Sequence, residues 1–470
     1  MAGIPWLPVE ILTRIFTILT KADLRPLSSA CKPFRAIVQP LLFSTIKIGH
    51  DRGLDHKYIR ARLQYLGQVP HIASYIRHVT VTRNVERAHW LQSLPALLNS
   101  TTQLRSLHLR FIYVDGDLAE PLITRTCHPG FQLKFHQCIF TTTLTLTSTP
   151  IQLETLMLEA CLGSPSFPLF LLENSHRTIR ACVFGMAARA ARPLIQKQYK
   201  AFEFPANPLV LPGLRSLVVR RIHSTFLSYN RSIENLWLLP TFSPSELQSP
   251  FENLPPSSLP NLRVYRGSWN DAKVFVPGRP IERILLDAYK PKIFHYIEGL
   301  EEWWRDVLGV ITKSTARLLS FACNTNFTIT AFKQIALLCP YLRVLHVQLA
   351  VVSVNRRLSS RGTLGVNVLF ELLPNFKQLC NLNVDQVGGG SFETLAEFMC
   401  YLTIIKQKVP TITTVKWRRD DAGVVSIIDC GRWEGYSNFT PNGWSISVEY
   451  AHEDTDDWFP EEFWYFSDLM

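Results

Sequence analysis

The segment LPVEILTRIFTILTKADLRPLSSACKPFRAIVQPLLF, which runs from Leu7 to Phe43, sets the organisation of the chain. Its first part carries apolar residues at steps of one, three and four, and this spacing gathers them on one face of a helix. Prolines divide the segment, and proline is tolerated best in the first turn of a helix. Pro8, Pro26 and Pro33 therefore each predict the start of a short helix.

Two further residues define the expected helix ends. Asp23 is the predicted N-cap of the second helix, because its carboxylate can accept a hydrogen bond from a first-turn N–H. Pro40 is predicted to kink the third helix or end it early. Three short helices within about forty residues bury too little surface to be stable alone, so the module must dock on the rest of the chain or on a partner.

This ordered pattern resembles an F-box. The matching positions are Leu7-Pro8, Glu10-Ile11-Leu12, Ile15-Phe16, Leu19, Asp23-Leu24, Cys31, Phe34-Arg35, Pro40 and Leu42-Phe43. One departure is that Phe34 stands where many members of the family carry Trp, although both residues supply a large ring.

The resemblance implies that the module binds the Skp-type adaptor of an SCF ubiquitin ligase and, through it, a cullin scaffold. The residues that it assigns to the adaptor surface are Leu7, Pro8, Ile11, Leu12, Ile15, Phe16 and Leu24. The alternative is that these apolar side chains only make a helical cap for the following domain.

Composition describes a globular chain with many short elements. Of the 470 residues, 47% are hydrophobic, and 30 prolines favour frequent turns. No run reaches the roughly 18 apolar residues of a membrane helix, and the first ten residues do not resemble a secretory signal. We therefore expect an intracellular protein, cytoplasmic or nuclear, without a membrane association.

The sequence offers no pattern that requires an enzyme, a metal or a cofactor. The ten cysteines are scattered without a CxxC pair, and the 13 histidines form no HExxH motif. Gly388-Gly389-Gly390-Ser391 lacks the lysine of a phosphate-binding loop, and adjacent Cys127 and His128 are a poor candidate for a nucleophile and its base. We expect a non-catalytic protein.

Beyond the first module, the pattern of an apolar residue at positions one, four and six recurs twelve times. Clear copies begin at Ile76, Leu104, Leu153, Leu214, Ile233, Ile281, Leu342 and Leu379, and weaker copies begin at Ile179, Leu262, Leu318 and Ile412. The last three positions alternate as in a strand with one buried face, and several copies follow a helix-like segment. A repeated helix, turn and strand is the unit of a solenoid, in which neighbouring units stack to bury their apolar faces.

The copies resemble a degenerate leucine-rich repeat array. The ninth position, which is Asn or Cys in that family, is met by Cys161 and Asn326, whereas Ile112, Ala350 and Val387 stand there in other copies. The predicted fold class is thus α/β, with a small three-helix F-box followed by an irregular leucine-rich-repeat-like solenoid of parallel strands with helices outside. The alternative is a mixed α/β domain in which the strand patterns coincide by chance.

The predicted domains are an F-box at residues 1–48, the repeat array at 49–410, and a C-terminal β cap with an acidic aromatic tail at 411–470. Candidate linkers lie at residues 49–55, 243–261 and 387–391. From about Thr411 onward the sequence favours antiparallel strands that cover the last edge of the array.

In a solenoid, the residues that alternate with the buried ones point onto the open face of the sheet, where a target protein can bind. The candidate target-binding residues on this face are His108, Arg110, Arg220, Trp237, Arg266, His346 and Lys416. Arg and aromatic side chains dominate interface energies. The resemblance then implies a substrate receptor, in which the F-box holds the adaptor and the repeats hold a target.

The net charge is +11, and between Arg180 and Arg231 nine Lys and Arg residues accompany one acid, Glu203. The simplest interpretation of this segment is a solvated basic face. Arg220 lies both in this segment and on the expected open face, so a sharper hypothesis is an acidic or phosphorylated target. Two alternatives stay open, a nucleic-acid-binding repeat protein, which the lack of a nucleic-acid fold signature disfavours, and an adaptor-bound scaffold that acts outside ubiquitin transfer.

Overall fold

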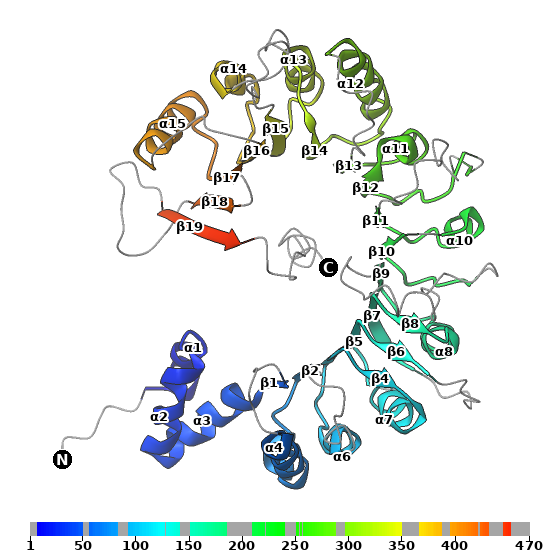
Figure 1. Cartoon of the computed structure of the whole chain (residues 1–470), viewed down its shortest axis with the longest axis vertical. Coiled ribbons are helices and arrows are strands. Elements are labelled where there is room, and N and C mark those ends of the chain that lie inside the picture. Colours follow the sequence, from blue (N-terminus) through cyan, green and yellow to red (C-terminus); the bar gives the residue numbers. More distant parts are fainter. Residues whose placement is uncertain are drawn as a thin grey trace. The chain divides into compact units, whose positions relative to one another are not determined.

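The structure is a computed structural model, in which the chain divides into two compact units, Met1–Val219 and Arg220–Met470. The residues that it describes are 7–49, 56–82, 93–126, 128–141, 151–185, 209–220, 222–239, 251–252, 254–255, 257–287, 297–349, 366–387, 395–421, 424–431 and 445–452. Each unit combines parallel strands with helices (Figure 1).

The first unit begins with three helices, α1 (Val9–Thr17), α2 (Lys21–Ala30) and α3 (Lys32–Phe43). The N-cap of α2 is Thr20, so the prediction of Asp23 as the N-cap is wrong. The Asp23 N–H donates to Thr20 Oγ1 at 3.3 Å, while the Asp23 carboxylate accepts from the Thr20 N–H at 3.2 Å. This reciprocal capping box satisfies two free N–H groups, whereas a single cap at Asp23 would satisfy one.

The expected early end of the third helix is also wrong, because α3 passes through Pro40 and continues to Phe43. Proline removes one N–H donor from a helix. Here that loss falls in the last turn, after most of the helical hydrogen bonds have formed.

Seven strands of the first unit form one parallel sheet in the order β1-β2-β3-β5-β7-β9-β10. Their bounds are β1 (Thr45–Ile48), β2 (His78–Thr82), β3 (Ser106–Arg110), β5 (Phe131–His136), β7 (Leu153–Glu159), β9 (Ala181–Gly185) and β10 (Ser216–Val219). Residues alternate between buried and half-buried along β3 and β5, because successive side chains of a strand point to opposite faces. One face therefore packs into the core and the other stays open.

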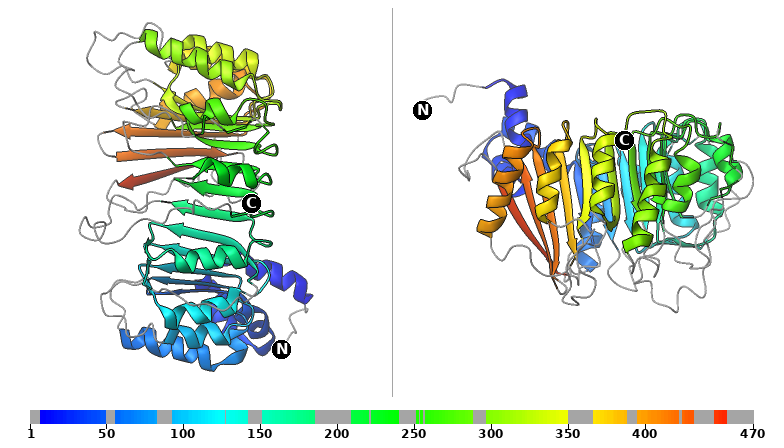
Figure 2. Two further views of the ribbon diagram at one scale, coloured as in Figure 1. Left: turned by 90° about the vertical axis from the view of Figure 1, so that its right-hand side faces the viewer. Right: turned by 90° about the horizontal axis from the view of Figure 1, so that it is seen from above.

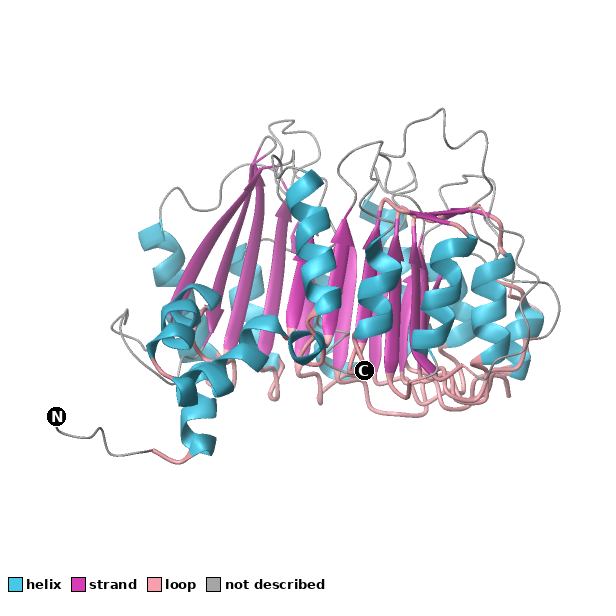
Figure 3. Cartoon of the chain, turned by 90° about the horizontal axis from the view of Figure 1, so that it is seen from below, coloured by secondary structure: helices cyan, strands magenta, loops and turns pink. Residues whose placement is uncertain are grey.

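Helices cover the buried face of this sheet, as Figures 2 and 3 show. They are α4 (His56–Gln68), α5 (Pro70–Ala73), α6 (Leu94–Ser100), α7 (Gly116–Thr126) and α8 (Ser166–Asn174). Their apolar residues, such as Leu97 and Leu171, are fully buried against the strands. The sheet and its helices thus enclose one continuous core.

A second, three-stranded sheet connects strands to helices in the first unit. It consists of β4 (Tyr113–Val114), β6 (Ile139–Phe140) and β8 (Leu162–Gly163). The chain turns into each of these strands through a residue with positive φ, namely Phe111 (58°), Gln137 (50°) and Ala160 (55°). Three consecutive repeats therefore use the same left-handed turn, although none has glycine at that place.

The second unit repeats the arrangement. Its strands are β11 (Asn235–Leu238), β12 (Val264–Ser268), β13 (Arg283–Asp287), β14 (Ser320–Asn326), β15 (Val344–Leu349), β16 (Asn381–Val387), β17 (Thr414–Asp421), β18 (Val424–Gly431) and β19 (Ser445–His452). Its helices are α10 (Ser224–Tyr229), α11 (Trp269–Phe275), α12 (Ile297–Ile311), α13 (Ile329–Leu338), α14 (Val366–Leu372), the 3₁₀ turn η3 (Leu373–Asn375) and α15 (Leu395–Lys408). The strands from β11 to β17 are parallel and neighbour one another in chain order.

Three strands, β17, β18 and β19, follow Thr411. β17 pairs parallel with β16, so it continues the array. Only β18 and β19 run antiparallel to their neighbours. The acidic aromatic tail, residues 453–470, lies outside the described residues.

The predicted fold class is confirmed: N-terminal helices precede parallel-strand sheets with helices on one face, as in a solenoid. Each of the twelve sequence copies contains or overlaps a strand. Among the described residues five strands were not predicted: the short β4, β6 and β8 of the second sheet, and β1 and β5 of the main sheet. β1 follows the pattern from Phe43 but overlaps the end of the helical module, and β5 has Gly130 where the first apolar residue is expected.

Candidate functional site

The three N-terminal helices enclose a small core of their own. Phe16, Leu24 and Val38 are buried at its centre, and the ring of Phe34 meets Phe16 edge to face at 5.3 Å. Phe34 thus fills the place where the resembled family often has Trp. The partly buried residues around this centre are Leu12, Leu19, Leu27, Phe34, Ile37, Leu41 and Leu42.

A stripe of apolar side chains on α1 points away from this core. Leu7, Ile11, Ile15 and Ile18 follow one another at steps of four, four and three. Ile11 and Ile15 share one face of α1, whereas Leu7 precedes the helix and Ile18 is its C-cap residue. All four are exposed, and Ile18 is the most exposed of them at 82%. Large apolar residues gathered on one exposed face mark an interaction surface.

The predicted adaptor residues divide between this stripe and the core. Leu7, Pro8, Ile11 and Ile15 are exposed, and Leu12 is half-buried. Phe16 and Leu24, by contrast, are only 4% exposed and hold the three helices together. Ile18 was not among the predicted residues, although its place one turn after Ile15 could have identified it.

The helical module is joined to the sheet without a linker. Lys21 Nζ donates to the carbonyl of Thr45 in β1 at 2.7 Å. Burial lowers the pKa of Lys21, and the nearby charges of Lys47, Arg62 and Arg25 lower it further. The surface around this contact is therefore strongly basic.

On the open face of the first unit, two of the predicted target-binding residues, His108 and Arg110, lie two positions apart on β3. His136 on β5 faces both of them, since it pairs in register with Arg110 and its ring meets that of His108 edge to face at 6.5 Å. Exposed Phe111 completes the cluster, with its ring 5.8 Å from the centre of the His136 ring.

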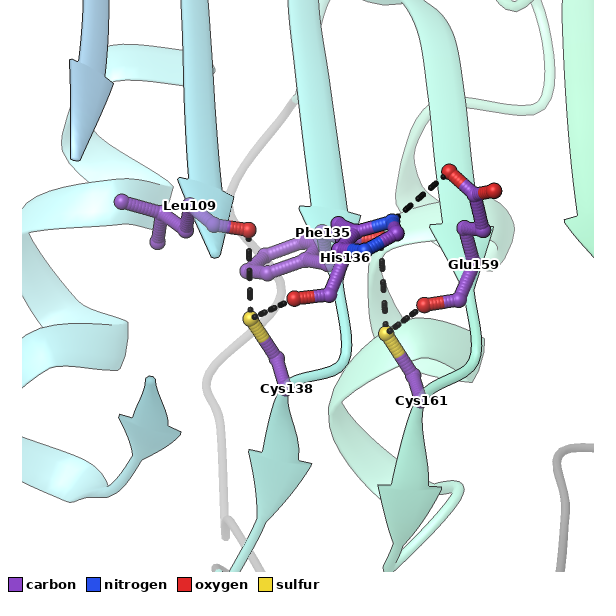
Figure 4. A network of polar contacts seen from close by, with 6 residues as sticks. All are labelled: Leu109, Phe135, His136, Cys138, Glu159 and Cys161. Atoms are coloured by element: carbon purple, nitrogen blue, oxygen red, sulfur yellow. Dashed lines mark hydrogen bonds and ion pairs between the residues drawn. The ribbon is translucent and has the colours of Figure 1, made fainter. Parts of the chain in front are cut away.

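Figure 4 shows the polar contacts at the ends of β3, β5 and β7. His136 Nδ1 lies 2.9 Å from Glu159 Oε2, and both side chains are mostly buried. Below them, Cys138 Sγ lies 3.3 Å from the carbonyl oxygen of Leu109, and Cys161 Sγ lies 3.5 Å from that of Phe135. The two thiols stabilise the left-handed turns, because each contacts a carbonyl of the preceding strand.

These contacts give the ninth-position residues a structural role. Cys161 was predicted at that position, and Cys138 holds the same place in the repeat that was missed. Burial raises the pKa of the Cys161 thiol well above its usual value, so it stays protonated and can donate.

The second unit carries the other five predicted target-binding residues, Arg220, Trp237, Arg266, His346 and Lys416, and all five are half-buried. They line one row of the open face from β11 onward, except Arg220, which precedes it. Within this row, Trp237 on β11 and Arg266 on β12 contact each other directly.

The guanidinium of Arg266 lies 3.8 Å from the centre of the Trp237 ring, and its Nε lies 3.4 Å from Asp287 Oδ2. The carboxylate of Asp287 partly neutralises Arg266. Trp237 and Arg266 therefore form a stacked pair, whereas His346 and Lys416 lie on other strands, β15 and β17.

Within the described residues, no helix combines the length and the apolar character needed to cross a bilayer. The described side chains also include no group of three or more His, Cys, Asp or Glu residues placed to hold a metal ion. Cys127 and residues 388–391 lie outside the described residues.

Comparison with known proteins identifies the N-terminal module. Residues 4–48 match the model of the F-box-like family. No curated protein matches the chain. A chain in the crystal structure of the Rad7 and Elc1 complex in yeast is 13% identical, with a TM-score of 0.37, and the match covers 80% of this chain and 88% of that chain. The first structural module of this protein, residues 4–48, is an F-box-like domain.

Proposed function

We propose that this chain is the substrate-recognition subunit of an SCF-type ubiquitin ligase, acting in the cytoplasm or nucleus. The F-box-like domain would bind a Skp-type adaptor and, through it, a cullin scaffold. The observation that carries the proposal is the F-box-like match at residues 4–48, together with the exposed stripe of Leu7, Ile11, Ile15 and Ile18 on the same domain.

The stripe is the part of the domain suited to hold an adaptor. Each large apolar side chain buried on binding contributes roughly 1.5 to 3 kcal/mol, so several together can anchor a stable complex. We assign direct adaptor contact to the exposed residues Leu7, Pro8, Ile11 and Ile15, with Ile18 added. Phe16 and Leu24 would support that surface from within, and Leu12 would lie at its edge.

The repeats would hold the target protein. We regard them as leucine-rich-repeat-like units spanning about residues 49–410, and the carbonyl contacts of Cys138 and Cys161 support this. The open face carries a mixed surface of Arg, His and Trp side chains, which is typical of protein interfaces. The chain itself would make or break no bond: holding the target raises the effective concentration of its lysines near the ubiquitin-carrying enzyme.

Introducing a charge on the stripe tests the adaptor role. We expect Ile11→Glu and Ile15→Glu each to reduce capture of the Skp-type adaptor by at least about tenfold, since a carboxylate would be buried in an apolar contact. Leu337→Glu is the matched control, because Leu337 is also a large apolar residue exposed on a helix, at 79% exposure, but lies on α13 in the second unit.

The measurement is adaptor co-purification followed by mass spectrometry, with and without proteasome inhibition. Undiminished capture by both Ile11→Glu and Ile15→Glu would remove the adaptor assignment. Proteins that accumulate with the wild-type chain only when the proteasome is inhibited would support substrate recognition. Partners that are insensitive to inhibition would instead support a scaffold outside ubiquitin transfer.

A further inference from the structure

Lys134 occupies the centre of the open face of the first unit. It lies on β5, directly between His108 on β3 and Met157 on β7 in the strand register. The next outward residue of β3 is Arg110, one strand across and two residues along. Strand spacing places Lys134 and Arg110 about 8 Å apart at Cα, so their long side chains can reach one bound group.

Lys134 and His108 are both partly removed from water on this part of the face. Burial lowers the pKa of Lys134. Burial, and then the charges of Arg110, His136 and Lys134, lowers the pKa of His108 to about 4. Removing a cation from water is costly unless an anion accompanies it.

The nearest acid in the cluster is already engaged, because Glu159 pairs with His136 at 2.9 Å. Among the described residues, neither Lys134 nor His108 has a side-chain ion pair with a carboxylate. An incoming anion would supply the missing counter-charge. Exposed Phe111, with Arg110 over its ring at 5.8 Å, offers an apolar surface beside it.

We propose that the open face of β3, β5 and β7 is a docking site for a phosphorylated segment of a target protein, with Lys134 and Arg110 binding the phosphate. This inference rests on the proposed function for its biological role and moves the anion-binding part of the target surface from Arg220 to the first unit. His108 lines the site beside Lys134, and Phe111 receives a neighbouring apolar side chain of the target.

A single phosphorylated side chain suits this site better than a nucleic acid does. The two cations occupy two adjacent strands, Lys134 on β5 and Arg110 on β3, which lie about 5 Å apart, and the Glu159 carboxylate on β7 bounds one side. A nucleic acid is bound through many successive phosphates, which requires a longer basic groove. A phosphate group offers three acceptor oxygens and nearly two negative charges in one place.

The test uses the full chain and an immobilised library of peptides with a fixed phosphothreonine and random flanking residues. The same library with unmodified threonine is the reference. At pH 7.5, where the phosphate is mostly dianionic, we expect wild-type protein to bind the phosphorylated library at least about tenfold more tightly.

Three substitutions locate the binding. Lys134→Met keeps the aliphatic stem but removes the charge, and we expect it to abolish most of the preference for phosphate. Lys134→Arg keeps the charge and should retain binding within about threefold. Lys333→Met, on the exposed surface of α13 in the second unit, is the matched control and should bind as the wild type does.

If Lys134→Met fails to fold, as shown by a lost melting transition, Arg110→Met serves as the second variant and should weaken phosphopeptide binding. Undiminished preference in a folded Lys134→Met protein would overturn the inference, as would a wild-type chain without preference for phosphate. Tighter, steeply salt-dependent binding of a 20-nucleotide single-stranded DNA through Lys134 would overturn it in favour of nucleic acid.

Adaptor capture by the same preparations separates this inference from the proposed function. A chain that captures the adaptor but ignores phosphothreonine would leave the proposed function standing and remove the docking site. A chain that prefers phosphothreonine but captures no adaptor would do the reverse.

Discussion

His108 is the residue whose protonation most directly affects the folded first unit. Its pKa is lowered from 6.5 to about 4, first by burial and then by Arg110, His136 and Lys134. Below pH 6.5 the unfolded chain therefore binds a proton that the folded chain does not. The folded state is at full stability above pH 6.5 with respect to this group, and it loses stability as the pH falls toward 4.

We expect this single group to cost roughly 1–3 kcal/mol between pH 7 and pH 4.5, since each unit of pKa shift corresponds to about 1.4 kcal/mol and the side chain is partly solvated. Urea unfolding of the wild type and of His108→Gln at both pH values measures it. The variant should lose less stability on acidification. An equal loss in both proteins would show that His108 does not carry the effect.

At the scale of elements, the capping box at the start of α2 fixes where the second helix of the F-box-like domain begins. We expect Thr20→Ala to destabilise this domain by about 1 kcal/mol, because it leaves N–H groups of the first turn without their partner. Thr17→Ala is the matched control, because Thr17 Oγ1 donates to the Arg14 carbonyl at the end of α1 and caps no helix start.

The readout is protection of α2 amides from hydrogen exchange in the full chain. Faster exchange in α2 is expected for Thr20→Ala but not for Thr17→Ala. Matched exchange rates in the two variants would mean that tertiary packing, rather than the cap, holds this helix end.

The elements also show what the sequence could and could not predict. The repeat pattern located twelve strands because each buries apolar residues at fixed spacing, and this periodicity is visible without the structure. β5 escaped because Gly130 replaces the first apolar residue, while Phe131 next to it is buried instead. Because β5 was not predicted, its outward residues Lys134 and His136 were not predicted either. The centre of the charged face was therefore missed, while its neighbours His108 and Arg110 were found.

The F-box-like domain illustrates a different limit. α1 is apolar on two faces, one with Leu12 and Phe16 and the other with Ile11 and Ile15. Periodicity assigns residues to faces, but only the packing of α1 against α3 decides which face becomes the core. The resemblance assigned Phe16 to the adaptor surface, whereas the packing of the three helices buries it.

At the scale of the whole molecule, the last strands protect the edge of the array in the second unit. β17 continues the parallel sheet from β16, and β18 and β19 then extend it in the antiparallel sense. Removing residues 411–470 would leave β16 as an unpaired edge, and such edges recruit other chains. We expect the truncated protein to self-associate.

Size-exclusion chromatography with light scattering measures this outcome against the full chain. Adaptor capture should persist in the truncated protein, because the F-box-like domain lies in the first unit. A monodisperse, monomeric truncated protein would show that β17 to β19 do not protect the edge.

The join between α3 and β1 has a mechanical consequence. Only Ser44 separates the helix from the strand, and its carbonyl accepts the N–H groups of both Arg77 and His78 at 2.9 Å. The hydrogen bond from Lys21 to the Thr45 carbonyl further restrains rotation at this junction. A target bound to β3, β5 and β7 would keep a fixed orientation relative to the exposed apolar stripe at α1. That orientation, more than the number of lysines on the target, would then determine which lysines can be modified.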